Sequence, residues 1–352
     1  MRTISREHGF TLVELLVSCT VMLVILCAVM TTFNQAVMIS DLGTEMADSD
    51  LNLRAGTNLL VRDLMQAGRV IGVAGIPVPS GTGATPINRP SPPGLAYALD
   101  NTNATTLSAI VTGANLGPVV NNSTTDMVTM LMADPVLPFA NLAAVAVAAN
   151  GASMTLGATS VWLTGDVANG IMPINVGDLV WFNSGGGAIQ TVTSRDSTTV
   201  YFAAGDWFNF NQRSTAQGAQ GTVMQLKVGS AFPAMKVYRV LMTTYYVDAT
   251  TTPGTHRFTR VQNHYSPQAL AGVVEDFELS YDLVDTVTNP INQRSLPYTF
   301  NGLTYTANQI RKVNLRVAVR AEKRSTRLNN YMRDQVSTSV TIRDLASVNR
   351  YQ

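Results

Sequence analysis

The distribution of apolar residues divides the first part of the chain into two stretches. Residues 15–33 contain no charge and no proline, and a helix needs ~20 apolar residues to cross the core of a bilayer. Between residues 39 and 68, apolar positions recur at spacings of four and seven, which is typical of a helix with one buried face. We therefore expect one long helix over residues 10–68, with residues 10–33 in a membrane.

The remaining pattern changes twice along the chain. Residues 75–94 hold six prolines and four glycines, a composition that predicts a loop or linker. Residues 95–230 show short β-prone runs between Gly, Asp and Asn clusters, which favours small antiparallel sheets. Residues 231–352 contain longer runs in which apolar and polar residues alternate, as in strands with one buried face. The predicted fold is α+β: a long N-terminal helix packed on a β-rich head with antiparallel sheets.

The first nine residues differ from an ordinary secretory signal. They are polar, and Arg2 and Arg6 favour retention of this end in the cytoplasm. A secretory signal is cut after its apolar region, but here the abrupt boundary lies between Gly9 and Phe10, before that region. We expect residues 1–9 to be a leader, and cleavage after Gly9 would leave the membrane helix on the mature chain.

Glu14 is an unusual residue for this position. A carboxylate near the end of a membrane helix costs a few kcal/mol and is normally paired or functional. In a chain that begins at Phe10, the new α-amino group would lie about one helical turn from Glu14, in the same chain or in a neighbour. That cation would neutralise the carboxylate.

The run Gly9-Phe10-Thr11-Leu12-Val13-Glu14-Leu15-Leu16 resembles the processing site of type IV prepilins and pseudopilins. The resemblance implies cleavage after Gly9 by prepilin peptidase, N-methylation of Phe10 and a role for Glu14 in filament assembly. It further implies a single-pass inner-membrane protein with a periplasmic head that later joins a pilus at the cell surface. The implied partners are the inner-membrane assembly platform, other minor pilins and the major pilin.

Two further runs are similar to one branch of these proteins. Leu60-Val-Arg-Asp-Leu-Met-Gln-Ala-Gly68 resembles the helix end of PilW-like minor pilins, and the runs 269–281, 310–319 and 339–345 resemble their C-terminal sheet. The J-type minor pseudopilins of type II secretion share this sheet. We expect a structural, non-catalytic minor pilin that primes or caps a type IV pilus, with a type II secretion pseudopilin as the alternative.

Candidate chemistry is sparse. Beyond the leader the histidines are His256 and His264, and no catalytic motif accompanies them. Cys19 and Cys27 lie eight residues apart, about 12 Å along a helix, too far for a disulfide within one chain. We therefore expect no catalytic residues, no metal site and no cofactor.

The last 45 residues carry the one local charge bias. Ten cations oppose Glu322, Asp334 and Asp344 between residues 308 and 352, an excess of 10 − 3 = 7. This surface is a candidate for DNA or another polyanion, which would make the chain a DNA-binding pilin or tip adhesin. The favoured alternative is a solvated strand face that keeps a sheet edge from aggregating. The cations are Arg311, Lys312, Arg316, Arg320, Lys323, Arg324, Arg327, Arg333, Arg343 and Arg350.

Overall fold

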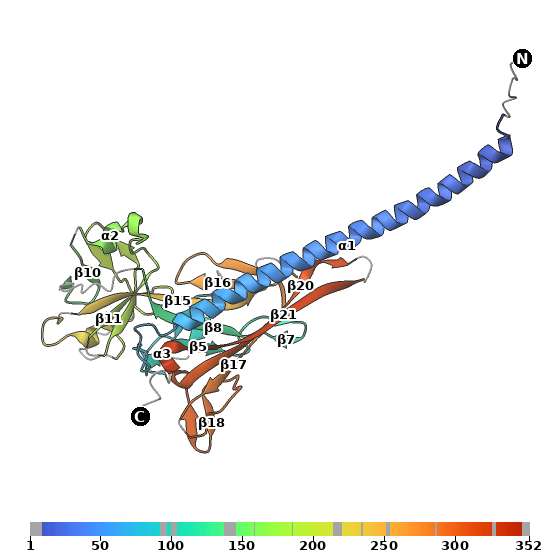
Figure 1. Cartoon of the computed structure of the whole chain (residues 1–352). Helices are drawn as coiled ribbons and strands as arrows, with labels where there is room; N and C mark the ends of the chain where they lie inside the picture. Colours follow the sequence, from blue (N-terminus) through green and yellow to red (C-terminus); the bar gives the residue numbers. More distant parts are fainter. Residues whose placement is uncertain are drawn as a thin grey trace, which may run out of the picture.

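The structure is a computed structural model, and it confirms the predicted α+β class. One long helix extends away from a β-rich head (Figure 1). Residues 1–8 of the leader and several other segments lie outside the described residues. The structure describes residues 9–91, 97–99, 104–136, 146–157, 159–184, 186–213, 220–233, 235–250, 254–285, 287–325 and 329–346.

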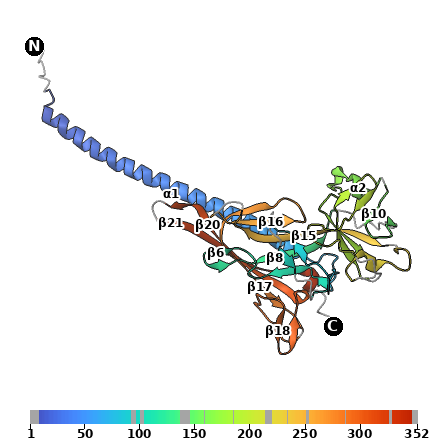
Figure 2. The ribbon, with the colours of Figure 1, turned by 180° about the vertical axis from the view of Figure 1, so that it is seen from behind.

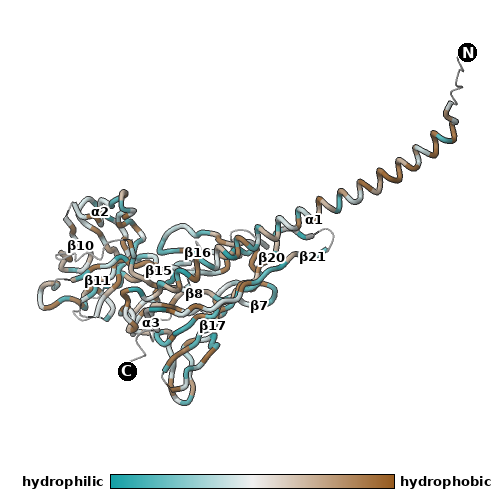
Figure 3. Tube along the Cα trace, viewed as in Figure 1, coloured by the Kyte–Doolittle hydropathy of each residue, from teal (hydrophilic) through white to brown (hydrophobic). Residues whose placement is uncertain are grey.

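Helix α1 (Leu12–Gln66) has 55 residues, which corresponds to about 80 Å at ~1.5 Å per residue. Its outer half carries the apolar stretch and lies clear of the head (Figure 3). Its buried residues begin only at Leu53 and continue at Gly56, Leu60 and Leu64. These positions repeat every three to four residues, so they form one stripe along the helix that packs on the sheet.

The helix packs closely on the sheet at Gly56. A Cβ atom at this position would lie 3.2 Å from Cβ of Leu270 and 3.4 Å from a ring carbon of Phe258. Gly43, further toward the membrane end, has no atom within 4 Å of the corresponding point. The absence of a side chain at Gly56 therefore permits close packing, whereas Gly43 lies in open space.

A nine-stranded antiparallel sheet forms the body of the head. Its strand order is β12-β11-β15-β16-β17-β20-β21, and β8 pairs with β15 and carries β5. Helix α1 covers β17, β20 and β21 on one face (Figures 1 and 2). The strands are β5 (Ile110–Gly113), β8 (Met127–Ala133), β11 (Leu179–Asn183), β12 (Ala188–Thr191), β15 (Lys236–Asp248), β16 (Arg257–Gln262), β17 (Gln268–Leu283), β20 (Ile310–Ser325) and β21 (Asn330–Thr341).

Strand β15 joins the two halves of the head. Its first residues, Lys236–Val240, pair with β11, and its last, Thr243–Asp248, pair with β16. Strand β8 pairs with Val240–Tyr245. The regions that we expected on either side of residue 230 therefore contribute to one continuous sheet.

Smaller elements surround this sheet. A four-stranded sheet and short helix α2 lie beside β11, four hairpin-like pairs lie elsewhere, and α3 follows β21. The additional elements are β9 (Ala146–Val147), β10 (Ser153–Thr155), β13 (Ser194–Arg195) and β14 (Thr199–Tyr201); β1 (Ile76–Pro77) with β4 (Thr106–Leu107); β2 (Ile87–Arg89) with β3 (Tyr97–Leu99); β6 (Val119–Val120) with β7 (Ser123–Thr124); β18 (Tyr298–Phe300) with β19 (Leu303–Tyr305); α2 (Val161–Thr164) and α3 (Arg343–Ala346).

The proline-rich segment predicted as a loop or linker contains β1 and β2 within its described part. Ile76, Val78 and Ile87 in this segment are buried in the same cluster as Leu179 and Phe210. A proline in a two-residue edge strand is tolerated because its missing N–H is not needed for pairing. The segment is therefore packed into the head rather than separated from it.

Candidate functional site: the N-terminal helix and its joint with the head

The helix begins with a capping box formed by Thr11 and Glu14. The Thr11 backbone N–H and its hydroxyl each donate to Glu14 Oε2 at 3.0 Å. In return, the Glu14 N–H donates to Thr11 Oγ1 at 3.3 Å. Such a box satisfies backbone donors that no helical carbonyl can reach. In the precursor, the Glu14 carboxylate is therefore hydrogen-bonded within its own chain.

Gly9 and Phe10 lie just outside this cap and are accessible. Both residues precede the helix, and the Phe10 side chain is 85% exposed. A peptide bond in exposed backbone outside a helix is accessible to a protease. Cleavage after Gly9 and methylation of Phe10 remain predictions, as does the role of Glu14 in filament assembly.

The apolar part of the helix has no partner within the described residues. An 18-residue window reaches a mean hydropathy of 2.7, and none of it is buried. Cys19 and Cys27 are free thiols on this exposed surface. An unbroken apolar helix of this length is suited to a bilayer or to a bundle of similar helices, so we infer that it anchors the chain in a membrane.

At its other end, the helix is joined to the sheet through Asp63. The Tyr245 hydroxyl of β15 donates to Asp63 Oδ2 at 2.8 Å, and Arg260 Nε of β16 donates to the same oxygen at 2.9 Å. Asp63 is only 3% exposed. Burial, followed by the nearby Asp63 charge, raises the pKa of Tyr245 above its usual range. The phenol therefore stays protonated and keeps donating to the carboxylate.

The sequence contains a signal for this joint. Asp63 lies between Leu60 and Leu64, on the apolar stripe of the helix. A carboxylate on a buried face needs a hydrogen-bonding or charged partner. The partners were not predictable, because Tyr245 and Arg260 are separated from Asp63 by 182 and 197 residues.

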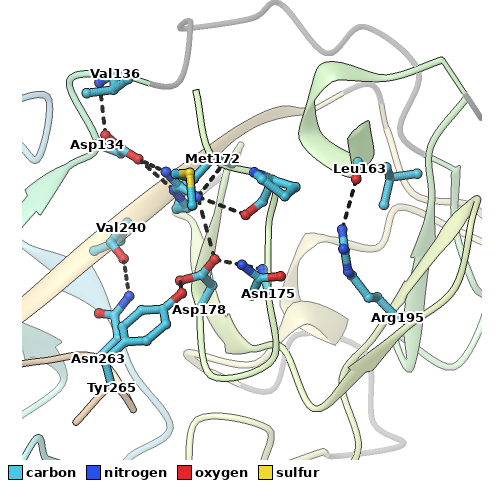
Figure 4. Close-up of polar contacts among 12 residues, drawn as sticks. Asp134, Val136, Leu163, Met172, Asn175, Asp178, Arg195, Val240, Asn263 and Tyr265 are labelled. Carbon is cyan, nitrogen blue, oxygen red and sulfur yellow. Dashed lines mark hydrogen bonds and ion pairs between the residues drawn. The ribbon is translucent and has the colours of Figure 1, made fainter. Parts of the chain in front are cut away.

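A second buried ion cluster joins β8, β11 and β15. Arg239 Nε donates to Asp134 Oδ2 at 2.6 Å, and Arg239 Nη1 lies 3.6 Å from Asp178 Oδ2. The Tyr265 hydroxyl donates to Asp178 Oδ1 at 2.7 Å, and the Asn175 N–H donates to Oδ2 at 2.8 Å (Figure 4). One guanidinium thus balances two carboxylates, and we interpret the cluster as a structural clamp.

The two described histidines lie on either side of β16. His264 stacks on Trp207 with ring centroids 3.8 Å apart, and burial lowers the pKa of its imidazole. His256 lies just before β16. Within the ranges that the structure describes, no three His, Cys, Asp or Glu side chains come together as metal ligands.

Four of the ten cations of the basic stretch near the C-terminus are paired with carboxylates of β17. Glu275 of β17 lies 3.7 Å from Arg320 and accepts from Arg333 Nε at 2.7 Å. Lys312 and Arg316 lie 3.6 and 3.7 Å from Asp282 and Asp276. Strand β17 thus supplies the acidic counterpart of β20. Arg327 and Arg350 lie outside the described residues.

Comparison with known proteins yields one match. Residues 4–30 match the family model described as the prokaryotic N-terminal methylation motif. We found no match to the chain among curated proteins or among solved structures. The motif is a type IV prepilin-like signal, and it indicates a type IV pilin-like or pseudopilin precursor. Such a signal implies processing by prepilin peptidase and assembly with other pilins.

Proposed function

We propose that this precursor is a structural, non-catalytic minor pilin of PilW type, which primes or caps a type IV pilus. The observation that carries the proposal is the combination of a prepilin-like signal with an exposed apolar helix whose other end is hydrogen-bonded to a head. The helix enters the core of the filament, and the head remains on the periplasmic side until assembly. A large head suits a tip position, because fewer neighbours crowd it there.

Assembly requires that Glu14 exchange partners. In the precursor, its carboxylate accepts from Thr11. After cleavage before Phe10, an α-amino group becomes available to it. A cation is the stronger partner in an apolar environment, because it adds an attraction between opposite charges that is large where the dielectric constant is low. We propose that this ion pair positions the helix in the filament.

The test compares wild type with Glu14→Ala in cells. Mass spectrometry of the membrane-extracted chain should show a mature protein that starts at N-methylated Phe10 in both. Immunoblots of sheared pili and of membranes should show the mutant in the membrane but depleted from pili, since loss of the carboxylate leaves the α-amino group without its partner. Asp41→Ala, which removes an exposed carboxylate from the same helix, should assemble normally.

Each other outcome has a clear meaning. Equal recovery of Glu14→Ala and wild type in pili would remove the assembly role of Glu14. An uncleaved chain would contradict the processing proposal. Recovery only in a fraction that depends on type II secretion genes would favour the minor pseudopilin alternative, because the same anchor and head suit that assembly.

A further inference from the structure

Two edge strands of the large sheet, β12 and β21, are treated differently. At one end, β12 is closed by the side chain of Asn211. The Thr191 N–H donates to Asn211 Oδ1 at 2.8 Å, and Asn211 Nδ2 donates to the Thr191 carbonyl at 2.8 Å. The amide thus imitates a neighbouring strand, and both residues are fully buried. No further chain can pair at this position.

The other end is strand β21, which pairs only with β20 among the described strands. The Ile342 N–H donates to the Arg311 carbonyl, so even-numbered residues here direct their backbone groups toward β20. The odd-numbered residues Ser337, Ser339 and Thr341 therefore direct their N–H and C=O groups away from the sheet. This is an open row of donors and acceptors.

Within the described part of the chain, the open row lacks the features that normally protect an edge strand. Proteins block such edges with charged side chains, prolines, bulges or covering segments. Residues 335–341 contain neither a charge nor a proline, and Ser337 and Ser339 are exposed. The cations of the basic stretch lie mainly on β20, and on β21 only Arg333 is one. From the sequence we expected these charges to keep a sheet edge from aggregating. Residues 335–341 of β21 carry none of them, so the charges do not protect this part of the edge.

The surface beside the row is also open. A polar groove of about 610 Å³ crosses the outer face of β17, β20 and β21, and Ser337, Thr338 and Ser339 line its end at the free edge. Val340 of the same strand is buried in the core, on the face of the sheet that helix α1 covers. The small hydroxyl side chains of Ser337 and Ser339 are exposed and leave the edge accessible among the described residues.

We propose that residues 337–341 of β21 bind an extended strand from a different subunit of the same assembly, which adds to the sheet by main-chain hydrogen bonds. This inference rests on the proposed function. An extended polypeptide is the ligand because alternating N–H and C=O groups along a strand match only another backbone. The strand continues the nine-stranded sheet across the subunit boundary.

The geometry argues against a second copy as the occupant. Two β21 edges related by a two-fold axis would pair antiparallel. Helix α1 runs in the same general direction as β21 (Figures 1 and 2), so the two apolar helices would then point in opposite directions. Both could not enter one membrane. Head-to-tail pairing of copies through β12 is blocked by Asn211.

Hydrogen–deuterium exchange tests the proposal on the full chain. Exchange is measured for the chain in detergent micelles and for the chain in sheared fibres. We expect the amides of Ser337, Ser339 and Thr341 to exchange at least about tenfold more slowly in fibres, while Val336 and Val340 are slow in both. Equal exchange at the odd positions in fibres would overturn the proposal and leave the proposed function intact. Absence of the chain from fibres would contradict both.

A matched pair of variants provides a second readout. Ser339→Pro removes an outward N–H, a change that edge strands tolerate, whereas Ser339→Ala keeps it. We expect the proline variant to fall at least about fivefold in fibres at an unchanged membrane level, and the alanine variant to match wild type. Equal recovery of both variants would overturn the proposal. So would a disulfide-linked homodimer of Ser337→Cys in a background without Cys19 and Cys27.

Discussion

At the scale of single residues, Asp63 joins helix α1 to the head through its contacts with Tyr245 and Arg260. Asp63→Asn removes the charge that Arg260 and Tyr245 share, and it leaves the Arg260 guanidinium in a nearly buried position. We expect the free energy of unfolding to fall by about 3–5 kcal/mol. Urea unfolding of the full chain in detergent micelles, followed by tryptophan fluorescence, measures this change.

The exposed pair on the same helix is the matched control. Arg54 Nε lies 2.6 Å from Asp50 Oδ1, with the two side chains 68% and 35% exposed. Asp50→Asn should change the free energy of unfolding by about 0.5 kcal/mol or less, since exposed i,i+4 pairs contribute little. Similar losses in both variants would show that Asp63 is no more than a surface charge.

Tyr245 also predicts how stability depends on pH. Its pKa is raised in the folded state, first by burial and then by Asp63, so the native chain holds this proton to a higher pH than the unfolded chain. The stabilisation is complete below the unfolded value of ~10 and is lost as the pH rises above it, at up to about 1.4 kcal/mol per pH unit.

Tyr245→Phe removes one group that releases a proton on unfolding at high pH. The free energy of unfolding of this variant should therefore decline less steeply as the pH rises, by up to about 1.4 kcal/mol per pH unit. The measurement is the free energy of unfolding at several pH values between about 9 and 11. Burial also raises the pKa of Tyr246, Tyr265 and Tyr281, so the variant keeps part of the decline. An unchanged slope would contradict the assigned role of Tyr245.

At the scale of elements, the pairing of β17 with β20 predicts weak binding to DNA. Glu275, Asp276 and Asp282 lie within 4 Å of cations on β20 or β21, which reduces the field available to phosphates. We expect the full chain to bind duplex DNA with a Kd no tighter than ~10⁻⁶ M at ~0.15 M salt, as for non-specific binding. Gel-shift titration over a range of salt concentrations measures it.

Glu275→Gln is the informative variant for this element. It removes the negative charge that lies beside both Arg320 and Arg333. We therefore expect the affinity of the chain for DNA to rise. Binding by wild type that is much tighter than non-specific, and that Arg316→Ala weakens, would instead favour the DNA-binding alternative.

At the scale of the whole molecule, the helix divides into a part that the head needs and a part that it does not. Buried residues begin at Leu53. Removal of residues 1–35 should therefore yield a soluble, monomeric head whose free energy of unfolding is unchanged within about 0.5 kcal/mol. Sedimentation and urea unfolding measure this.

A longer deletion is the control for the truncation. Removal of residues 1–57 also deletes Leu53 and Gly56, and the loss of the one buried leucine should cost at least about 2–5 kcal/mol. Aggregation of the shorter deletion would show that the apolar helix, or a partner, is part of the folded unit.

The sequence by itself determined the parts that depend on local chemistry. The apolar run, the boundary at Gly9 and Phe10, and the isolated carboxylate Glu14 are readable without any contact, because a bilayer acts on each residue directly. The α+β class followed from the change of apolar spacing along the chain, since burial of one face imposes a period on a helix or a strand.

Only the tertiary structure decided which distant segments meet. Ile76, Val78 and Ile87 lie in a stretch whose prolines predict a loop, yet they are buried because neighbouring strands supply a core. Asp63 acquires Tyr245 and Arg260, and β15 joins strands from both sides of residue 230. The local spacing of apolar residues predicts that a face is buried. It does not predict which segment covers that face, because strands that pair can lie far apart in the sequence. For the same reason, the open edge at Ser337, Ser339 and Thr341 becomes visible only when every other strand has been placed.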